Sequence, residues 1–140
     1  MREFVKPVCF TRVVEATDSL GRRLGYGYDP AGNRVALTLP EGGVIRYNYY
    51  ANNRLRGITD PEGRSTLFER DGVGNLRRQF NPNGTVTEAA YDRANRLRSL
   101  TSRRLDGTVI AAFAYELNEV GLRTVMTATY GWRHPPVVVE

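Results

Sequence analysis

Three aspartates recur in step along this 140-residue chain, and their side chains are the first candidates for chemistry. Asp29, Asp71 and Asp92 each begin a turn that runs on to Gly-Asn or Asn-Arg. Carboxylate and amide oxygens suit a calcium ion. Alternatively, such side chains accept hydrogen bonds from their own turn backbone. We favour the second interpretation and expect no metal or cofactor, because Tyr50 replaces the aspartate in one copy and no turn offers enough oxygens.

Tyrosines recur in the same register and offer a different chemistry. Tyr28, Tyr49 and Tyr91 share a column, and Tyr47 and Arg46 lie beside the second of them. Aromatic rings next to a guanidinium could stack on sugars or on bases. The alternative is a cross-strand aromatic ladder, in which each pair contributes ~0.2–1 kcal/mol. We favour the ladder, and we expect no nucleic-acid binding because no known binding-fold pattern accompanies the arginines.

The residues of common enzyme sites are missing or isolated. His134 is the sole histidine and is followed by two prolines, which makes it a poor member of a Ser-His-Asp triad. Cys9 is the sole cysteine, so the chain has neither an intramolecular disulfide nor a zinc cluster of Cys and His. The glycine-rich turns are not followed by the Gly-Lys-Ser/Thr of a phosphate loop. We therefore predict that the chain is not an enzyme.

The composition fits a folded domain with a mildly basic surface. Hydrophobic residues make up 41% of the chain, and the formal net charge is +5, carried almost wholly by arginine. Because the charges are spread rather than clustered, we read them as solvent-facing strand positions rather than as a polyanion site. The first ten residues contain no apolar run typical of a secretion signal, and no stretch approaches the ~20 apolar residues of a membrane span.

An internal repeat of 21 residues positions all of these candidates. Its clearest column is glycine, at Gly21, Gly42, Gly63 and Gly84. Three of these glycines end Pro-containing turns such as "LPEG" (39–42), where Pro presets φ and Gly accepts a positive φ at the fourth position. This chemistry predicts a hairpin turn with a glycine bulge.

Each unit then reads as a strand, a second turn and a returning strand. In "GVIRYNYY" (43–50), Ile45, Tyr47 and Tyr49 alternate with more polar partners, which is typical of a half-buried strand. In the returning strand, Leu55 and Ile58 are three residues apart and cannot face one side of a regular strand. A bulge near Gly57 would resolve the conflict.

The predicted fold class is all-β: an antiparallel twisted sheet of consecutive hairpins that forms a strip or partial shell. The repeat domain is expected at 13–127, between off-pattern segments at 1–12 and 128–140. The individual repeats are expected near 21–41, 42–62, 63–83, 84–106 and 107–127.

The repeated Tyr-Asp, the Gly-Asn or Asn-Asn turn and the Thr-Asp-Pro-x-Gly turn resemble the YD repeats of the Rhs (rearrangement hotspot) family over residues 13 to about 127. This resemblance implies spiralling antiparallel sheet, as in toxin-enclosing shells and teneurin-type barrels, and an extracellular or cell-surface location. The chain departs from the toxin-bearing members, because no self-cleaving Asp-containing motif follows Met126. Five or six repeats also give a strip only ~50 Å wide.

A strip of this kind leaves strand edges and one apolar sheet face uncovered. We therefore expect a structural role through self-association, in a shell or filament, or as part of a larger YD-repeat protein. Val137, Val138 and Val139 are the expected subunit contact. One alternative is a carbohydrate-binding or adhesion module that uses Tyr47, Tyr49 and Arg46. The other is a fragment of a toxin-encapsulating Rhs shell.

Overall fold

A computed structural model describes residues 12–131 and 136–139, and the elements in these ranges are all strands. No helix in the described part of the chain is long and apolar enough to cross a membrane. Cys9, His134 and nearly all of the predicted segment 1–12 lie outside it. The strands are β1 (Glu15–Thr17), β2 (Arg23–Tyr28), β3 (Arg34–Thr38), β4 (Val44–Tyr49), β5 (Leu55–Thr59), β6 (Ser65–Arg70), β7 (Leu76–Phe80), β8 (Thr85–Tyr91), β9 (Leu97–Arg104), β10 (Val109–Leu117), β11 (Arg123–Tyr130) and β12 (Val137–Val139).

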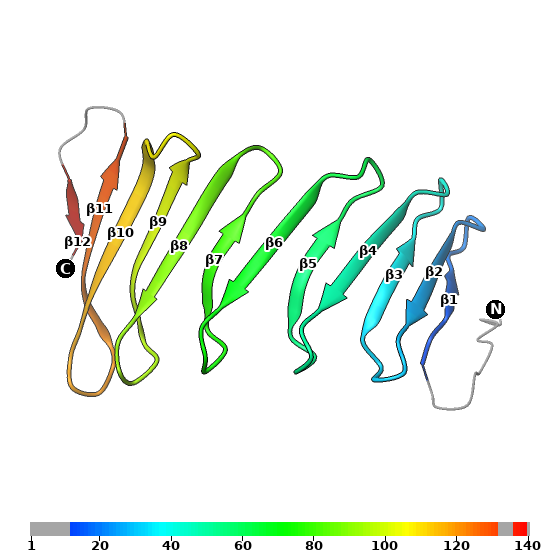
Figure 1. Ribbon diagram of the computed structural model, residues 1–140, viewed down its shortest axis with the longest axis horizontal. Helices are drawn as coiled ribbons and strands as arrows, with labels where there is room; N and C mark the ends of the chain where they lie inside the picture. The colour runs from blue at the N-terminus through cyan, green and yellow to red at the C-terminus, as the bar shows by residue number, and fades with distance from the viewer. Residues whose placement is uncertain (1–11, 132–135, 140) are drawn as a thin grey trace. The chain divides into compact units, whose positions relative to one another are not determined.

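The strands form an antiparallel sheet whose spatial order is the order of the sequence (Figure 1). This confirms the predicted all-β strip of consecutive hairpins. The chain divides into two compact units, residues 1–66 and 67–140. The first unit contains β1 to β5 and the start of β6, and the second contains the rest of β6 and β7 to β12.

Ten chain reversals within the described residues share one hydrogen-bond pattern. In each, the N–H of the fourth turn residue donates to the C=O of the first, and the N–H of the first donates to the C=O of the fifth. The fourth residue always has a positive φ, from 60° at Asn53 and Asn95 to 98° at Gly74. This is the three-residue hairpin loop in which a type I turn is followed by a left-handed residue. Turns ending at Gly21, Gly42, Gly63, Gly84 and Gly107 lie on the upper edge in Figure 1, and those ending at Gly32, Asn53, Gly74, Asn95 and Gly121 lie on the lower edge.

A bulge sits at the same place in each hairpin that closes on the lower edge. In β4 and β5, Asn48 pairs with Gly57 and Tyr49 with Leu55, so Arg56 is the extra residue. The bulge predicted near Gly57 is therefore confirmed. The same register shift makes Val35, Arg77, Arg98 and Thr124 the extra residues of the other four hairpins.

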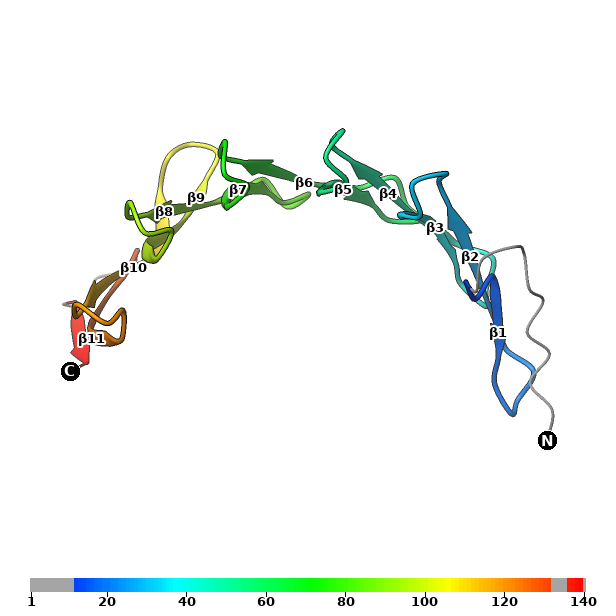
Figure 2. The ribbon, with the colours of Figure 1, turned by 90° about the horizontal axis from the view of Figure 1, so that it is seen from below.

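Each unit is a single layer of strands with no layer packed on either face (Figure 2). Along β4 and β6, half-buried residues alternate with exposed ones, as a period-two strand requires. Among the described residues, only Gly57 and Ala128 are classed as buried. The chain exposes 10519 Å², whereas a globular monomer of 15.8 kDa exposes about 7,300 Å². The described residues therefore form no core of their own.

At Gly63 the left-handed residue is needed for its backbone conformation and not for space. A Cβ added at Gly63, where φ is 83°, would meet no atom within 4 Å. We expect Gly63→Ala to lower the free energy of unfolding by about 1–2 kcal/mol, because an L side chain strains this conformation. Gly72 also has open space around it but no positive φ, so Gly72→Ala is the matched control and should change little. Urea unfolding of both variants checks this, and equal effects would contradict it.

Candidate functional site

The candidate residues take part in three kinds of side-chain contact, which repeat within the turns and between neighbouring hairpins. We call them Asp clamps, tyrosine bridges and amide links, and each is defined below. They use the aspartates and tyrosines that the sequence singled out for chemistry. All of them lie at or beside the turns, which the 21-residue period places at regular intervals along the two edges of the sheet.

An Asp clamp forms where the first turn residue is aspartate. One carboxylate oxygen of Asp29 accepts the backbone N–H of Asn33 at 2.8 Å, and the other accepts the side-chain amide of Asn33 at 2.9 Å. At other clamps an arginine Nε replaces the amide, at 2.6 Å between Arg64 and Asp60. The five clamps are Asp18–Arg22, Asp29–Asn33, Asp60–Arg64, Asp71–Asn75 and Asp92–Arg96.

The clamps give the aspartate column a role within the turns. Both oxygens of each clamped carboxylate accept hydrogen bonds from their own turn, as the turn interpretation predicts. Within residues 12–131 and 136–139, no three His, Cys, Asp or Glu side chains gather as a metal site. At Asn118, which holds the aspartate position of the last lower-edge turn, the side-chain oxygen accepts the N–H of Leu122 at 2.9 Å.

The clamps lower the pKa of the aspartates below the usual 3.8. The largest cause at Asp18 and Asp29 is the side-chain hydrogen bond from the fifth turn residue. At Asp92 it is the hydrogen bond from the backbone N–H of that residue. At Asp60 and Asp71, burial alone would raise the pKa, but the hydrogen bonds from the fifth residue outweigh it.

A tyrosine bridge joins each of three hairpins to the strand before it. The hydroxyls of Tyr28, Tyr49 and Tyr91 donate to the backbone C=O of the residue fifteen positions earlier, at 2.9, 2.8 and 3.0 Å. For Tyr49 the acceptor is Arg34, the first residue of β3. Backbone pairing between β3 and β4 runs from Thr38 only as far as Ala36. The tyrosine hydroxyl thus continues the connection where the main chains separate.

These bridges replace the aromatic ladder that the sequence suggested. Tyr28 and Tyr49 lie on β2 and β4 with β3 between them, a separation of two strands or ~9.6 Å. Among the described residues, the three bridging rings pair with no other ring; the ring pair found is Phe113 with Tyr130, edge to face at 6.2 Å. Burial raises the pKa of Tyr49 although the charge of Arg34 opposes it, which keeps the hydroxyl a donor.

Amide links join neighbouring lower-edge turns, and the sequence analysis missed them. The side-chain amide of Asn33 donates to the Oδ1 of Asn53 at 2.8 Å, and that of Asn75 donates to the Oδ1 of Asn95 at 3.1 Å. Their signal was present in the sequence: Gly-Asn turns alternate with Asn-Arg turns, which gives a second period of 42 residues. Each unit contains one such link.

The residues proposed for ligand stacking do not form one site. Arg46 alternates with Tyr47 and Tyr49 along β4, so its side chain projects from the opposite face of the sheet. The guanidinium of Arg34 covers the ring of Tyr47 at 4.8 Å from its centroid. The proposed subunit contact lies elsewhere. Val137, Val138 and Val139 form β12, and one edge of this strand pairs with β11 of the same chain. The other edge of β12 faces away from the sheet.

The tyrosine bridge can be tested with a pair of conservative changes. Tyr49→Phe removes only the hydroxyl that donates to the Arg34 carbonyl, so we expect a loss of about 1 kcal/mol in the free energy of unfolding. Tyr26 is half-buried on the preceding hairpin, and its hydroxyl has no hydrogen-bond partner among the described residues. Tyr26→Phe is therefore the control. If urea denaturation gives the same loss for both variants, the bridge has no energetic role.

The Asp clamps predict a stability that depends on pH in one direction. Because each clamped carboxylate has a lower pKa in the folded than in the unfolded chain, its contribution is complete above the unfolded value and is lost as the pH falls through the folded one. The urea midpoint should therefore stay level from pH 7 to pH 5 and fall below the ordinary aspartate value of 3.8. Asp71→Asn should flatten that fall; a midpoint unchanged down to pH 2 would contradict the clamps.

Solved structures with a similar fold come from Tc toxins. The chain matches the Tc holotoxin pore of Photorhabdus luminescens with a mutated TccC3 at TM-score 0.69 and 21% identity, over 78% of this chain and 5% of that one. Crystal structures of TcdB2-TccC3-Cdc42, and of TcdB2-TccC3 without its hypervariable C-terminal region, match at 0.68 and 0.67, both at 22% identity, over 77% and 76% of this chain and 6% and 5% of those. The chain thus spans about a twentieth of their length. No curated protein sequence matches it.

The family model described as RHS Repeat matches residues 11–44, 49–78 and 70–109. These ranges contain all five Asp clamps in full, and all three tyrosine hydroxyls of the bridges. Because the matches cover more than half of the sequence, this chain belongs to the RHS repeat family.

Proposed function

We propose that the chain is a non-enzymatic structural element: a section of β-strip in the wall of a larger YD-repeat assembly. The observation that carries this proposal is the missing core. The exposed surface exceeds that of a globular monomer of this mass by about 3,200 Å², which is surface that a partner could cover. A single layer of hairpins gains stability chiefly from neighbours that continue or cover it.

The two terminal strands support an edge-to-edge continuation. Among the described residues, β1 pairs only with β2, and β12 pairs only with β11. Each therefore presents a row of outward backbone N–H and C=O groups, which another strand can pair with. The partner is a second copy of this chain or the next hairpin of a longer polypeptide. We also propose an extracellular or cell-surface location, because the family resemblance implies one.

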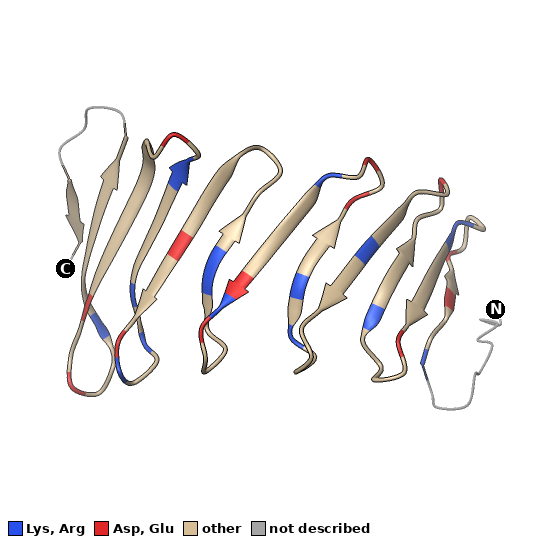
Figure 3. Cartoon of the chain, viewed as in Figure 1, with Lys and Arg blue, Asp and Glu red and all other residues tan. Residues whose placement is uncertain are grey.

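The charge distribution agrees with a wall rather than with a polyanion receptor. Arginines and acidic residues are interspersed over the strands and turns of each unit (Figure 3). Surface ion pairs such as Arg22–Asp18 stay exposed and contribute little to stability. Among such assemblies, the Tc-like fold favours a toxin shell, of which this chain would be a fragment. A carbohydrate-binding role would have to use one face of β4 alone, since Tyr49 and Arg46 are on opposite faces.

Self-association of the purified chain tests the edge proposal. We expect the mass from light scattering to rise with protein concentration between about 5 and 200 µM. Val138→Lys should keep the chain monomeric, because a charge on an edge strand opposes pairing with another edge. Val120→Lys, at an exposed turn tip, removes an exposed valine away from the edge and should leave association unchanged. A wild-type chain that stays monomeric throughout would contradict self-association.

A further inference from the structure

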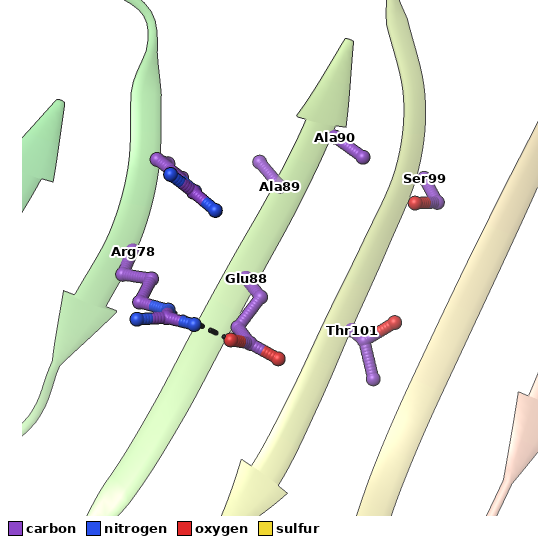
Figure 4. Close-up of a pocket in the computed structure, with 7 residues that line it drawn as sticks. Arg78, Glu88, Ala89, Ala90, Ser99 and Thr101 are labelled. Carbon is purple, nitrogen blue, oxygen red and sulfur yellow. Dashed lines mark hydrogen bonds and ion pairs between the residues drawn. The ribbon is translucent and has the colours of Figure 1, made fainter. Parts of the chain in front are cut away.

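A cavity of about 220 Å³ lies over β7, β8 and β9 of the second unit, and none of the contacts described above explains it (Figure 4). Its walls come from three neighbouring strands, so the backbone pairing of the sheet fixes their spacing. The lining residues are Arg77, Arg78, Glu88, Ala89, Ala90, Ser99 and Thr101.

The charges around the cavity leave one positive charge uncompensated. Arg78 Nε lies 2.8 Å from a carboxylate oxygen of Glu88, and its Nη1 lies 3.8 Å from Glu69. Arg103 approaches the other oxygen of Glu88 at 3.7 Å. Two guanidiniums thus face two carboxylates. Arg77 adds a third guanidinium, which is exposed and has no ion pair or hydrogen bond within the described part of the chain. The cavity therefore favours a ligand group with a single negative charge.

Two hydroxyl groups provide further hydrogen-bond donors at the cavity. Ser99 and Thr101 stand on β9 across from the Arg78–Glu88 pair (Figure 4). Both are half-buried, and neither hydroxyl has a hydrogen-bond partner among the residues described. The alanines between these groups are short, so they leave the cavity open. A carboxylate placed here would accept hydrogen bonds from the hydroxyls and an ion pair from Arg77.

The size and lining of the cavity indicate what kind of molecule carries that carboxylate. Sites for whole small-molecule ligands usually measure ~300–1,000 Å³, so this one suits a single side chain. No aromatic ring lines it, although a sugar ring needs such a flat apolar surface for its C–H face. We propose that the cavity receives an aspartate or glutamate side chain of an extended polypeptide segment lying across β7 to β9. This partner contact goes beyond the edge-to-edge role proposed above.

The test uses the full-length, ¹⁵N-labelled chain and two short blocked peptides, Gly-Ser-Glu-Ser-Gly and its match with Gln in place of Glu. We expect the Glu peptide to shift the amide resonances of Ala89, Ala90, Ser99 and Thr101, and the Gln peptide to leave them in place. Arg77→Gln should weaken the titrated affinity about fivefold. Arg77→Lys should recover part of it, since the charge returns. Arg46→Gln removes another exposed arginine, from the first unit, and should bind as the wild type does.

Four outcomes would overturn the proposal: no shifts with either peptide, equal shifts with both, an Arg77→Gln variant that binds as tightly as the wild type, or glucuronate shifting the resonances where the Glu peptide does not. If sodium acetate at the same concentration reproduces the shifts, the cavity binds an adventitious ion only. Thr101→Val provides a second variant should Arg77→Gln unfold, and it should also weaken binding. All spectra can be recorded on the Val138→Lys background, which separates this result from the outcome of the self-association test.

Discussion

The left-handed residue at the fourth position of the ten described turns is the constraint on which the rest of the structure depends. It lets a type I turn close in three loop residues, so each reversal uses the same length of chain. Constant turns with strands of five to nine residues keep β2 to β11 in register through nine reversals. Glycine meets this constraint eight times and asparagine twice, which are the residue types that tolerate the conformation.

Regular turns allow a sheet without a core to be held by contacts at its junctions. Asp clamps tie the fifth turn residue to the first, and tyrosine bridges reach from one hairpin to the strand before it where backbone pairing ends. These are hydrogen bonds to nearby backbone, so they need little burial. The consequence is that, among the described residues, the sheet is open on both faces and at both edges, which agrees with the proposed role as part of a larger assembly.

Much of this architecture was predictable from local chemistry. Pro and Gly at fixed turn positions predicted the reversals, and the three-residue spacing of Leu55 and Ile58 predicted a bulge before any coordinates. The tyrosine bridges were not predictable from the tyrosine column alone. Whether a hydroxyl meets another ring or a carbonyl fifteen residues earlier depends on where two strands separate, and no residue type marks that point. The arginines at three bulges, among them Arg77, recur every 21 residues, but only the register showed that they are extra residues.

Backbone NMR of the full chain in solution tests the central claim most directly, because amide–α-proton couplings, with the two α protons of each glycine stereospecifically assigned, report the sign of φ residue by residue. The account predicts positive φ at ten positions, in two series on the 21-residue interval: Gly21, Gly42, Gly63 and Gly84 with Gly107, and Gly32, Asn53, Gly74 and Asn95 with Gly121. Negative φ at several of these positions, or positive φ at residues between them, would contradict it.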